Sequence, residues 1–191
     1  MTTITPPVRN GIDTAQLYGT LDAIKADADL AHFEFRVHNR WVQGPHSRST
    51  IHGFYGAGQE DSSRTAAFEV DASEPPVLLG HNEAPNPAEF LLHALAGCLT
   101  LTIVNVAAAR KVTLTEVNST LEGVLDARGA LGLDDEYRNG FERIRVSVTV
   151  KGDAPREKLQ EIVDRTKARS VVYDMLTNGV PVEVHAQLGQ P

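Results

Sequence analysis

Residues 86–99 read NPAEFLLHALAGCL, and a mostly apolar run continues from there to residue 109. Asn86 suits helix capping and Pro87 suits a first turn, so we expect a long helix that starts here and ends near Lys111. A run of about 20 apolar residues is long enough to cross a bilayer. It contains histidine, threonine and asparagine, however, and no similar run accompanies it. We therefore favour a helix at the centre of a soluble core, with no membrane contact.

The segment before this helix changes from a helical pattern to a strand pattern. Between residues 14 and 31 the apolar residues recur at helical spacing, which predicts an amphipathic helix. The stretch from Phe33 to Trp41 alternates apolar with polar residues, as a half-buried strand does. A turn at residues 43–46 then returns the chain over residues 47–55, and a third strand is expected at residues 65–70.

The segment after the long helix also mixes strands with a helix. Strands are expected at residues 116–125 and, more clearly, at residues 144–150, where Ile and Val alternate with polar residues. Asp153-Ala-Pro155 opens a second helix, and a short turn through Tyr173 leads to a last strand at residues 182–188. Because the strands occur in runs rather than in strict βαβ order, the pattern predicts an α+β fold with antiparallel or mixed sheets.

The composition restricts the classes of function. The 191 residues include 18 Lys and Arg against 25 Asp and Glu, a formal charge of −7, which disfavours general binding to nucleic acid or to an anionic membrane. Cys98 is the single cysteine, so the chain builds neither an internal disulfide nor a multi-cysteine metal centre, and we expect no cofactor and no metal. The N-terminus has no signal-sequence pattern, which predicts a cytoplasmic protein.

Cys98 is the main candidate for chemistry. A free cysteine is more often a small buried hydrophobe than a nucleophile, and a reactive thiol needs a lowered pKa. The middle of a helix does not lower the pKa through the helix dipole, so a cation or a hydrogen-bond donor must come from another element. Arg36 and Arg40 share the polar face of the first expected strand, and Arg48 lies on its partner arm, so all three are candidates.

Two segments together resemble the OsmC/Ohr superfamily, whose members are described as osmotically inducible proteins and organic hydroperoxide reductases. The first is residues 86–99, with a proline-led helix, an acidic residue near its start and Gly-Cys in its middle. The second is residues 169–178, RSVVYDMLTN, which is similar to the segment around that superfamily's second cysteine. The resemblance covers about residues 30–188. It divides the chain into an N-terminal extension with an amphipathic helix, residues 1–31, and an OsmC-like domain, residues 32–191.

The resemblance implies an intertwined homodimer, in which sheets wrap around the long central helix and two sites lie near the dimer interface. It also implies a peroxidase site in which Cys98 attacks the peroxide, Arg40 stabilises the thiolate and Glu89 orients that arginine. Arg48 is the second choice for the arginine. Three further residues are expected to line the substrate pocket: Ser170, Tyr173 and Asp174.

This chain departs from the superfamily's pattern in two ways. Ser170 stands where the second cysteine is expected, so an oxidised Cys98 would need an external thiol as its resolving partner. Glu89 comes one place later than the glutamate of organic hydroperoxide reductases. The wider OsmC-like branch carries its glutamate at this later place, and we assign the chain to that branch.

Two hypotheses follow from this comparison. In the first, the protein is a cytoplasmic thiol-dependent peroxidase that reduces an organic hydroperoxide with Cys98 and an external thiol reductant. In the second, it is a non-catalytic OsmC-like dimer that binds an apolar small molecule at the interface pocket, and Cys98 is simply packed. The second hypothesis predicts a thiol pKa at or above the free value of about 8.5 and slow modification by iodoacetamide at neutral pH.

Overall fold

The computed structural model describes residues 8–189, which form two compact units. Unit 1 extends to His93 and includes Leu121–Arg145, whereas unit 2 comprises Ala94–Thr120 and the chain from Val146 onward. Residues 1–7 of the expected N-terminal extension and residues 190–191 of the expected OsmC-like domain lie outside the described range. The expected boundary between extension and domain stays a prediction.

Unit 1 begins with a short antiparallel strand pair and a helix. The strands are β1 (Val8–Arg9) and β2 (Ile12–Asp13), and the helix is α1 (Thr14–Ala26). Asp13 caps α1, because its side chain accepts hydrogen bonds from the N–H groups of residues 15 and 16. The helix expected over residues 14–31 therefore ends at Ala26, and a separate 3₁₀ turn, η1 (Ala28–Ala31), follows it.

Two three-stranded antiparallel sheets follow in unit 1. The first contains β3 (Phe33–Phe35), β6 (Phe54–Gly56) and β7 (Gln59–Asp61), in the order β3-β6-β7. The second contains β4 (His38–Gln43), β5 (His46–Ile51) and β8 (Phe68–Ala72), in the order β4-β5-β8. A 3₁₀ turn, η2 (Pro76–Leu78), lies on the loop that leads to the long helix.

The single half-buried strand expected over residues 33–41 is wrong in two respects. The strand breaks after Phe35, and its two pieces join different sheets. Its apolar side chains are also exposed, with 73% of Phe35, 62% of Val37 and 74% of Trp41 accessible to solvent. The alternation correctly indicates strands, but no element in the described part of the chain buries these three side chains.

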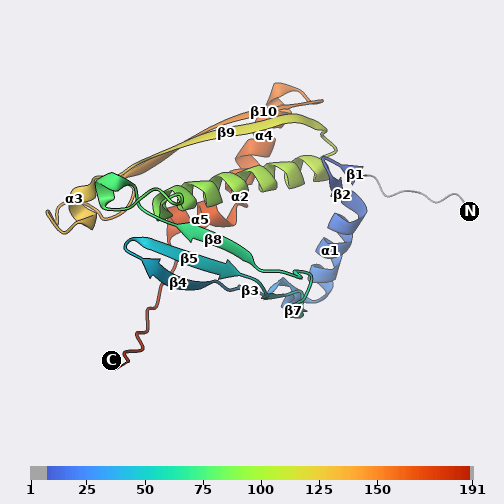
Figure 1. Cartoon of the computed structure of the whole chain (residues 1–191). Helices are drawn as coiled ribbons and strands as arrows, with labels where there is room; N and C mark the ends of the chain where they lie inside the picture. The colour runs from blue at the N-terminus through green and yellow to red at the C-terminus, as the bar shows by residue number, and fades with distance from the viewer. Residues whose placement is uncertain (1–7, 190–191) are drawn as a thin grey trace, which may run out of the picture. The chain divides into compact units, whose positions relative to one another are not determined.

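The long helix is α2 (Pro87–Ala109), which starts where the sequence predicts and ends two residues before Lys111. It is followed by the strand pair β9 (Leu114–Val124) and β10 (Arg143–Gly152), with the short helix α3 (Ala127–Ala130) between them, and then by α4 (Arg156–Lys167) and α5 (Val171–Asn178) (Figure 1). Within the described residues, α2 is the one helix long and apolar enough to cross a membrane, a test that the core helix of a soluble protein also passes.

The apolar core lies in unit 2. One stripe of α2 is fully buried and repeats every four residues, as one face of a helix does: Leu95, Leu99, Ile103 and Ala107. The end of this stripe packs against Val112 and against Ile162 of α4, with Val148 and Val150 of β10 beside them. Among the described residues, every fully buried apolar side chain belongs to unit 2, and unit 1 has none.

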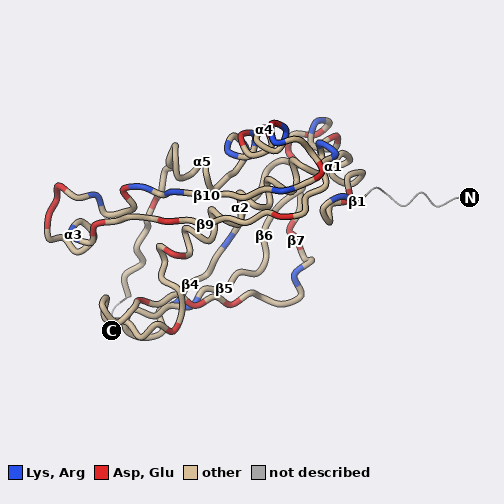
Figure 2. The backbone as a smooth tube through the Cα atoms, turned by 90° about the horizontal axis from the view of Figure 1, so that it is seen from above, with Lys and Arg blue, Asp and Glu red and all other residues tan. Residues whose placement is uncertain are grey.

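Opposite charges line the β9–β10 pair, with acidic residues on β9 and basic residues on β10 (Figure 2). Lys151 Nζ lies 2.6 Å from Glu116 Oε2, and Arg145 Nη1 lies 3.2 Å from Glu122 Oε2. Such exposed ion pairs add little stability, but opposite charges across neighbouring strands favour one register over the alternatives.

The last strand, expected at residues 182–188, is wrong. Residues 179–189 form neither helix nor strand, and Val182, Val184 and Leu188 are between 79% and 93% exposed. A strand exists only where a neighbouring strand satisfies its backbone N–H and C=O groups. Among the described strands none pairs with this segment, so its alternating pattern has no sheet to join.

Candidate functional site around Cys98

Cys98 lies on the part of α2 that belongs to unit 2, and its side chain is partly buried. It follows Leu95 by three residues and precedes Leu99, so it sits at the edge of the buried stripe rather than within it. Between residues 94 and 109 the sequence contains no other ionisable side chain. The groups that act on this thiol electrostatically must therefore come from another element.

The element that meets Cys98 is α5, which the sequence analysis expected only as a turn. Ser170 is the N-cap of α5, and its Oγ accepts a hydrogen bond from the N–H of Tyr173 at 3.3 Å. The same hydroxyl donates a hydrogen bond to Cys98 Sγ at 3.2 Å. Ser170 is only 1% exposed. A serine directly before an apolar run is a recognised helix-start signal, and it offered a way to predict α5.

The pKa of the Cys98 thiol is lowered by this environment. Burial acts in the opposite direction and raises the pKa, because it disfavours the charged thiolate. Hydrogen bonds from the Ser170 hydroxyl, from the backbone N–H groups of Val172 and Val171, and from Thr102 favour the thiolate and outweigh burial. The sequence analysis did not find the two N–H groups, since no spacing rule identifies which element lies across from a helix. It also missed Thr102, which lies one turn after Cys98 on the same helix.

The other two residues expected near the pocket, Tyr173 and Asp174, lie on the first turn of α5. Tyr173 is partly buried, and its backbone N–H is bonded to Ser170. Asp174 is exposed, and its Oδ1 accepts a hydrogen bond from Asn178 Nδ2 at 2.6 Å. The structure thus places both residues next to Ser170 along the chain, while their contact with a substrate stays a prediction.

Arg48 belongs to unit 1 and is held by an acidic neighbour. It lies opposite Asp71 across β5 and β8, and the guanidinium donates to the carboxylate from Nε at 2.6 Å and from Nη2 at 2.8 Å. This bidentate pair lowers the pKa of Asp71 to about 2. His46 Nε2 lies 3.4 Å from the same carboxylate. Arg48 therefore already has an anionic partner within its own unit.

The other two candidate arginines differ from each other. Arg36 forms two hydrogen bonds to Glu60, at 2.6 Å and 3.1 Å, so it too has an anionic partner. Arg40 lies directly opposite Arg48 on β4 and is exposed. Among the described residues it forms no ion pair. Of the three candidates, Arg40 is thus the arginine without an anionic partner in the described part of the chain. Its position beside Cys98 stays a prediction.

Glu89 has a structural role that its spacing from Asn86 indicates. Its Oε2 accepts a hydrogen bond from the backbone N–H of Asn86 at 2.8 Å, and Asn86 Oδ1 accepts one from the N–H of Glu89 at 2.9 Å. This reciprocal pair is a capping box that fixes the start of α2. The expected role of Glu89 in orienting an arginine stays a prediction.

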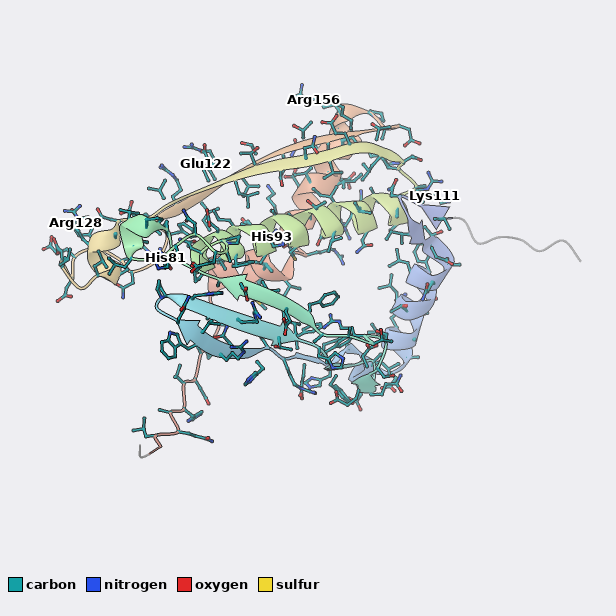
Figure 3. The ribbon with its side chains drawn as sticks, in the orientation of Figure 1. His81, His93, Lys111, Glu122, Arg128 and Arg156 are labelled. Atoms are coloured by element: carbon teal, nitrogen blue, oxygen red, sulfur yellow. The ribbon has the colours of Figure 1, made fainter. Side chains whose placement is uncertain are left out.

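Unit 1 contains two open depressions beside the start of α2. One, of about 470 Å³, is lined by four residues: Pro85, Glu89, Phe90 and His93. The other, of about 500 Å³, is lined by charged residues of the β5–β8 region and by the loop before α2, and it includes Arg48 and Asp71. His81 lies on that loop and His93 on α2 (Figure 3). Within residues 8–189, no group of three or more His, Cys, Asp or Glu side chains is arranged to hold a metal ion.

Comparison with known proteins links this architecture to one family. The sequence model for OsmC-like proteins matches residues 80–185, which include both α2 and α5. No curated protein sequence matches the chain significantly. Among solved structures, an OsmC-like protein from Mycoplasma pneumoniae shares 14% sequence identity with a TM-score of 0.59, over 82% of this chain and 98% of that one.

Two further solved structures are similar in fold. A putative osmotic stress induced and detoxification response protein from Psychrobacter arcticus shares 16% identity with a TM-score of 0.55, over 75% of this chain and 88% of that one. An organic hydroperoxide resistance protein from Legionella pneumophila shares 16% identity with a TM-score of 0.51, over 76% of this chain and 91% of that one. At these identities the likeness extends to the fold and no further.

Proposed function

Because this chain belongs to the family of OsmC-like proteins, we propose that it is a thiol-dependent peroxide reductase in which Cys98 is the single peroxidatic cysteine. The observation that carries the proposal is the hydrogen bond of 3.2 Å that the buried Ser170 hydroxyl donates to Cys98 Sγ, one of the contacts that lower the pKa of the thiol against the effect of its partial burial. A thiolate is the form of cysteine that attacks peroxides, and a merely packed cysteine has its pKa raised. The hydroperoxide-resistance name of the Legionella relative agrees with this chemistry.

The reaction has two stages. In the first, the Cys98 thiolate attacks one oxygen of the hydroperoxide, an S–O bond forms and the O–O bond breaks. The alcohol leaves with the proton that the thiol lost, and the sulfur is oxidised to a sulfenic acid. In the second, an external thiol attacks the sulfenic sulfur and water leaves, which gives a mixed disulfide. A second thiol molecule then releases Cys98 and leaves as the external disulfide.

The external thiol is needed because Ser170 cannot resolve the sulfenic acid. Its hydroxyl lies within 3.2 Å of the sulfur, where a second cysteine would close a disulfide, but an alcohol does not form one. We propose that the reductant is a small thiol of the cytoplasm, since a lone cysteine stays reduced there. The family's typically soluble character agrees with that location.

The proposed assembly is a homodimer. It is supported by the distribution of apolar surface: in the described chain, unit 1 has no fully buried apolar side chain, while Phe35, Val37 and Trp41 are largely exposed. Scattered exposed apolar residues are normal, but several large apolar side chains exposed within one short segment are typical of an interface.

The decisive experiment is intact-mass spectrometry after a stoichiometric pulse of cumene hydroperoxide, with dimedone present to trap sulfenic acid. We expect a single fast adduct on the wild-type protein, formed faster than with hydrogen peroxide, and no adduct on Cys98→Ser. Peroxide consumption with an added small thiol should fall to background in that variant.

An unmodified thiol after minutes of exposure would overturn the proposal. It would favour the second function, a non-catalytic dimer that binds an apolar small molecule. The apolar residues Pro85 and Phe90 in the depression of about 470 Å³ are the observation that supports this alternative. Screening of apolar ligands by thermal shift would then replace peroxide assays.

A further inference from the structure

Ser170 is held so that its one hydroxyl hydrogen has a defined direction. Its oxygen accepts the N–H of Tyr173 as the helix cap, which leaves the hydroxyl hydrogen to be donated elsewhere. The nearest acceptor that the structure assigns to it is Cys98 Sγ, at 3.2 Å. Because Ser170 is only 1% exposed, water does not compete for either bond. The cap and the thiol together therefore fix the rotamer of this serine.

Thr102 offers a second hydroxyl near Cys98, but its hydrogen is committed. Its Oγ1 donates to the backbone carbonyl of Cys98 at 2.7 Å, the usual bond of a threonine one turn further along a helix. A threonine has a single hydroxyl hydrogen, so it cannot serve the carbonyl and the sulfur equally. Ser170 is therefore the side chain that donates directly to the sulfur at 3.2 Å, and Thr102 contributes least among the groups that lower the pKa of Cys98.

We propose that Ser170 is a catalytic residue, whose hydroxyl, together with the first backbone N–H groups of α5, helps to hold Cys98 as a thiolate. The role in catalysis rests on the proposed function, whereas the hydrogen bond itself does not. A second cysteine at this position would form a disulfide with the oxidised sulfur, whereas the Ser170 hydroxyl does not react with it. Ser170 therefore keeps the thiolate stable before the attack and leaves the sulfenic acid open to an external thiol afterwards.

The charged surroundings are compatible with this role. On α2, Cys98 is the only ionisable residue between positions 94 and 109. On α5 the titratable residues are Tyr173 and Asp174, and Arg169 directly precedes Ser170. Asp174 is exposed and bonded to Asn178, and Arg169 is also exposed. The hydrogen bonds that favour the thiolate thus come from neutral groups.

The test is the pH dependence of Cys98 alkylation by iodoacetamide, which needs no peroxide and reports on a single thiol. In Ser170→Ala we expect the midpoint of the profile to rise and the rate at pH 7 to fall about tenfold, because the lost bond is one to a charged acceptor. Thr102→Val is the matched control. It removes a hydroxyl from the same site, and we expect a clearly smaller change.

Ser170→Gly distinguishes the effect of the hydroxyl on the Cys98 thiolate from its effect on the cap of α5. Glycine is tolerated at an N-cap and costs only a few tenths of a kcal/mol there, so this variant keeps α5 while it loses the hydroxyl. We expect its alkylation profile to match that of Ser170→Ala. If both serine variants keep the wild-type midpoint while circular dichroism shows them folded, the proposal is wrong. A different result is a midpoint that rises in both serine variants although the wild-type protein forms no sulfenic acid with peroxide. That result would confirm that the Ser170 hydrogen bond stabilises the thiolate and would reject only the peroxidase function.

Discussion

Asp71 lies across from Arg48 on neighbouring strands, and two hydrogen bonds shorter than 3 Å join their side chains. The planar guanidinium of Arg48 donates to both carboxylate oxygens of Asp71, and such a bidentate pair restricts the orientation of the two side chains more than a single contact does. His46 adds a third contact to the same carboxylate at 3.4 Å. Arg48 is thus already paired with a carboxylate of its own sheet, and Arg40 is the one of the three candidate arginines that forms no ion pair among the described residues.

Asp71→Asn tests this pair through its pH dependence. The pKa of Asp71 is lowered to about 2 in the folded protein, below its ordinary value of about 3.9. A depressed carboxyl pKa contributes stability above the ordinary pKa, and the contribution is lost as the pH falls towards the folded value. We expect Asp71→Asn to melt at a lower temperature than wild type at pH 7, with the gap closing between about pH 4 and pH 2.

Asp135→Asn is the control for this measurement, since Asp135 is exposed and forms no ion pair among the described residues. Its melting temperature should follow that of wild type across the whole pH range. A gap for Asp71→Asn that does not change with pH would contradict the assignment of the effect to the ionised carboxylate.

At this scale the sequence identified Cys98 and Ser170, and the structure brings them together at 3.2 Å. Both were predictable because Cys98 is the only thiol and the family motif aligns Ser170 with a thiol. The backbone N–H groups of Val171 and Val172 were not predictable. Their identity as donors depends on where α5 starts and on which residue of α2 it faces, and neither follows from periodicity.

The elements show which local signals were sufficient. The start of α2 was predictable because Asn86 suits helix capping and Pro87 suits a first turn, and the structure adds a capping box between Asn86 and Glu89. Its buried stripe was not predictable, because a helix that is apolar on every side shows no preferred face until its neighbours are known. The last strand failed for the opposite reason. Its alternation is clear, but a strand also needs a partner, and local sequence does not supply one.

Glu89→Gln separates two roles of the same carboxylate. Glutamine serves as well as glutamate in a capping box, so we expect the free energy of unfolding in urea to change by less than about 0.5 kcal/mol. If Glu89 also orients an arginine by its charge, the peroxide reduction rate should fall while stability is kept. Asn86→Ala is the complementary variant, with an expected loss of about 1 kcal/mol through the cap.

An equal loss of stability in Glu89→Gln and Asn86→Ala would show that the carboxylate charge itself supports the fold. Full activity in Glu89→Gln, together with wild-type stability, would instead leave Glu89 as a cap and remove it from the proposed reaction. The two measurements together assign the residue to one role, to the other or to both.

At the scale of the whole molecule, the two units differ in how much apolar surface they bury. Unit 2 has a core around Ile103 and Ile162, built from α2, α4 and the β9–β10 pair. Unit 1 has sheets with an apolar alternation but, among the described residues, no fully buried apolar side chain. Alternating apolar residues in a strand are expected to be buried on one face in the assembled protein. The exposed alternation at Phe35, Val37 and Trp41 is therefore explained if a second copy of the chain covers it.

Trp41 makes this testable, because it is the only tryptophan in the chain and is 74% exposed. In the proposed homodimer we expect sedimentation to give twice the 20.7 kDa of one chain and the tryptophan emission to be blue-shifted from that of a solvated indole. Phe35→Asp places a charge among the exposed aromatic side chains, so it should shift the protein towards the monomer and the emission towards the red. Leu133→Asp replaces an equally exposed apolar residue on the loop after α3 and should change neither property. A wild-type monomer with solvated emission would leave unit 1 uncovered, and the homodimer would have to be abandoned.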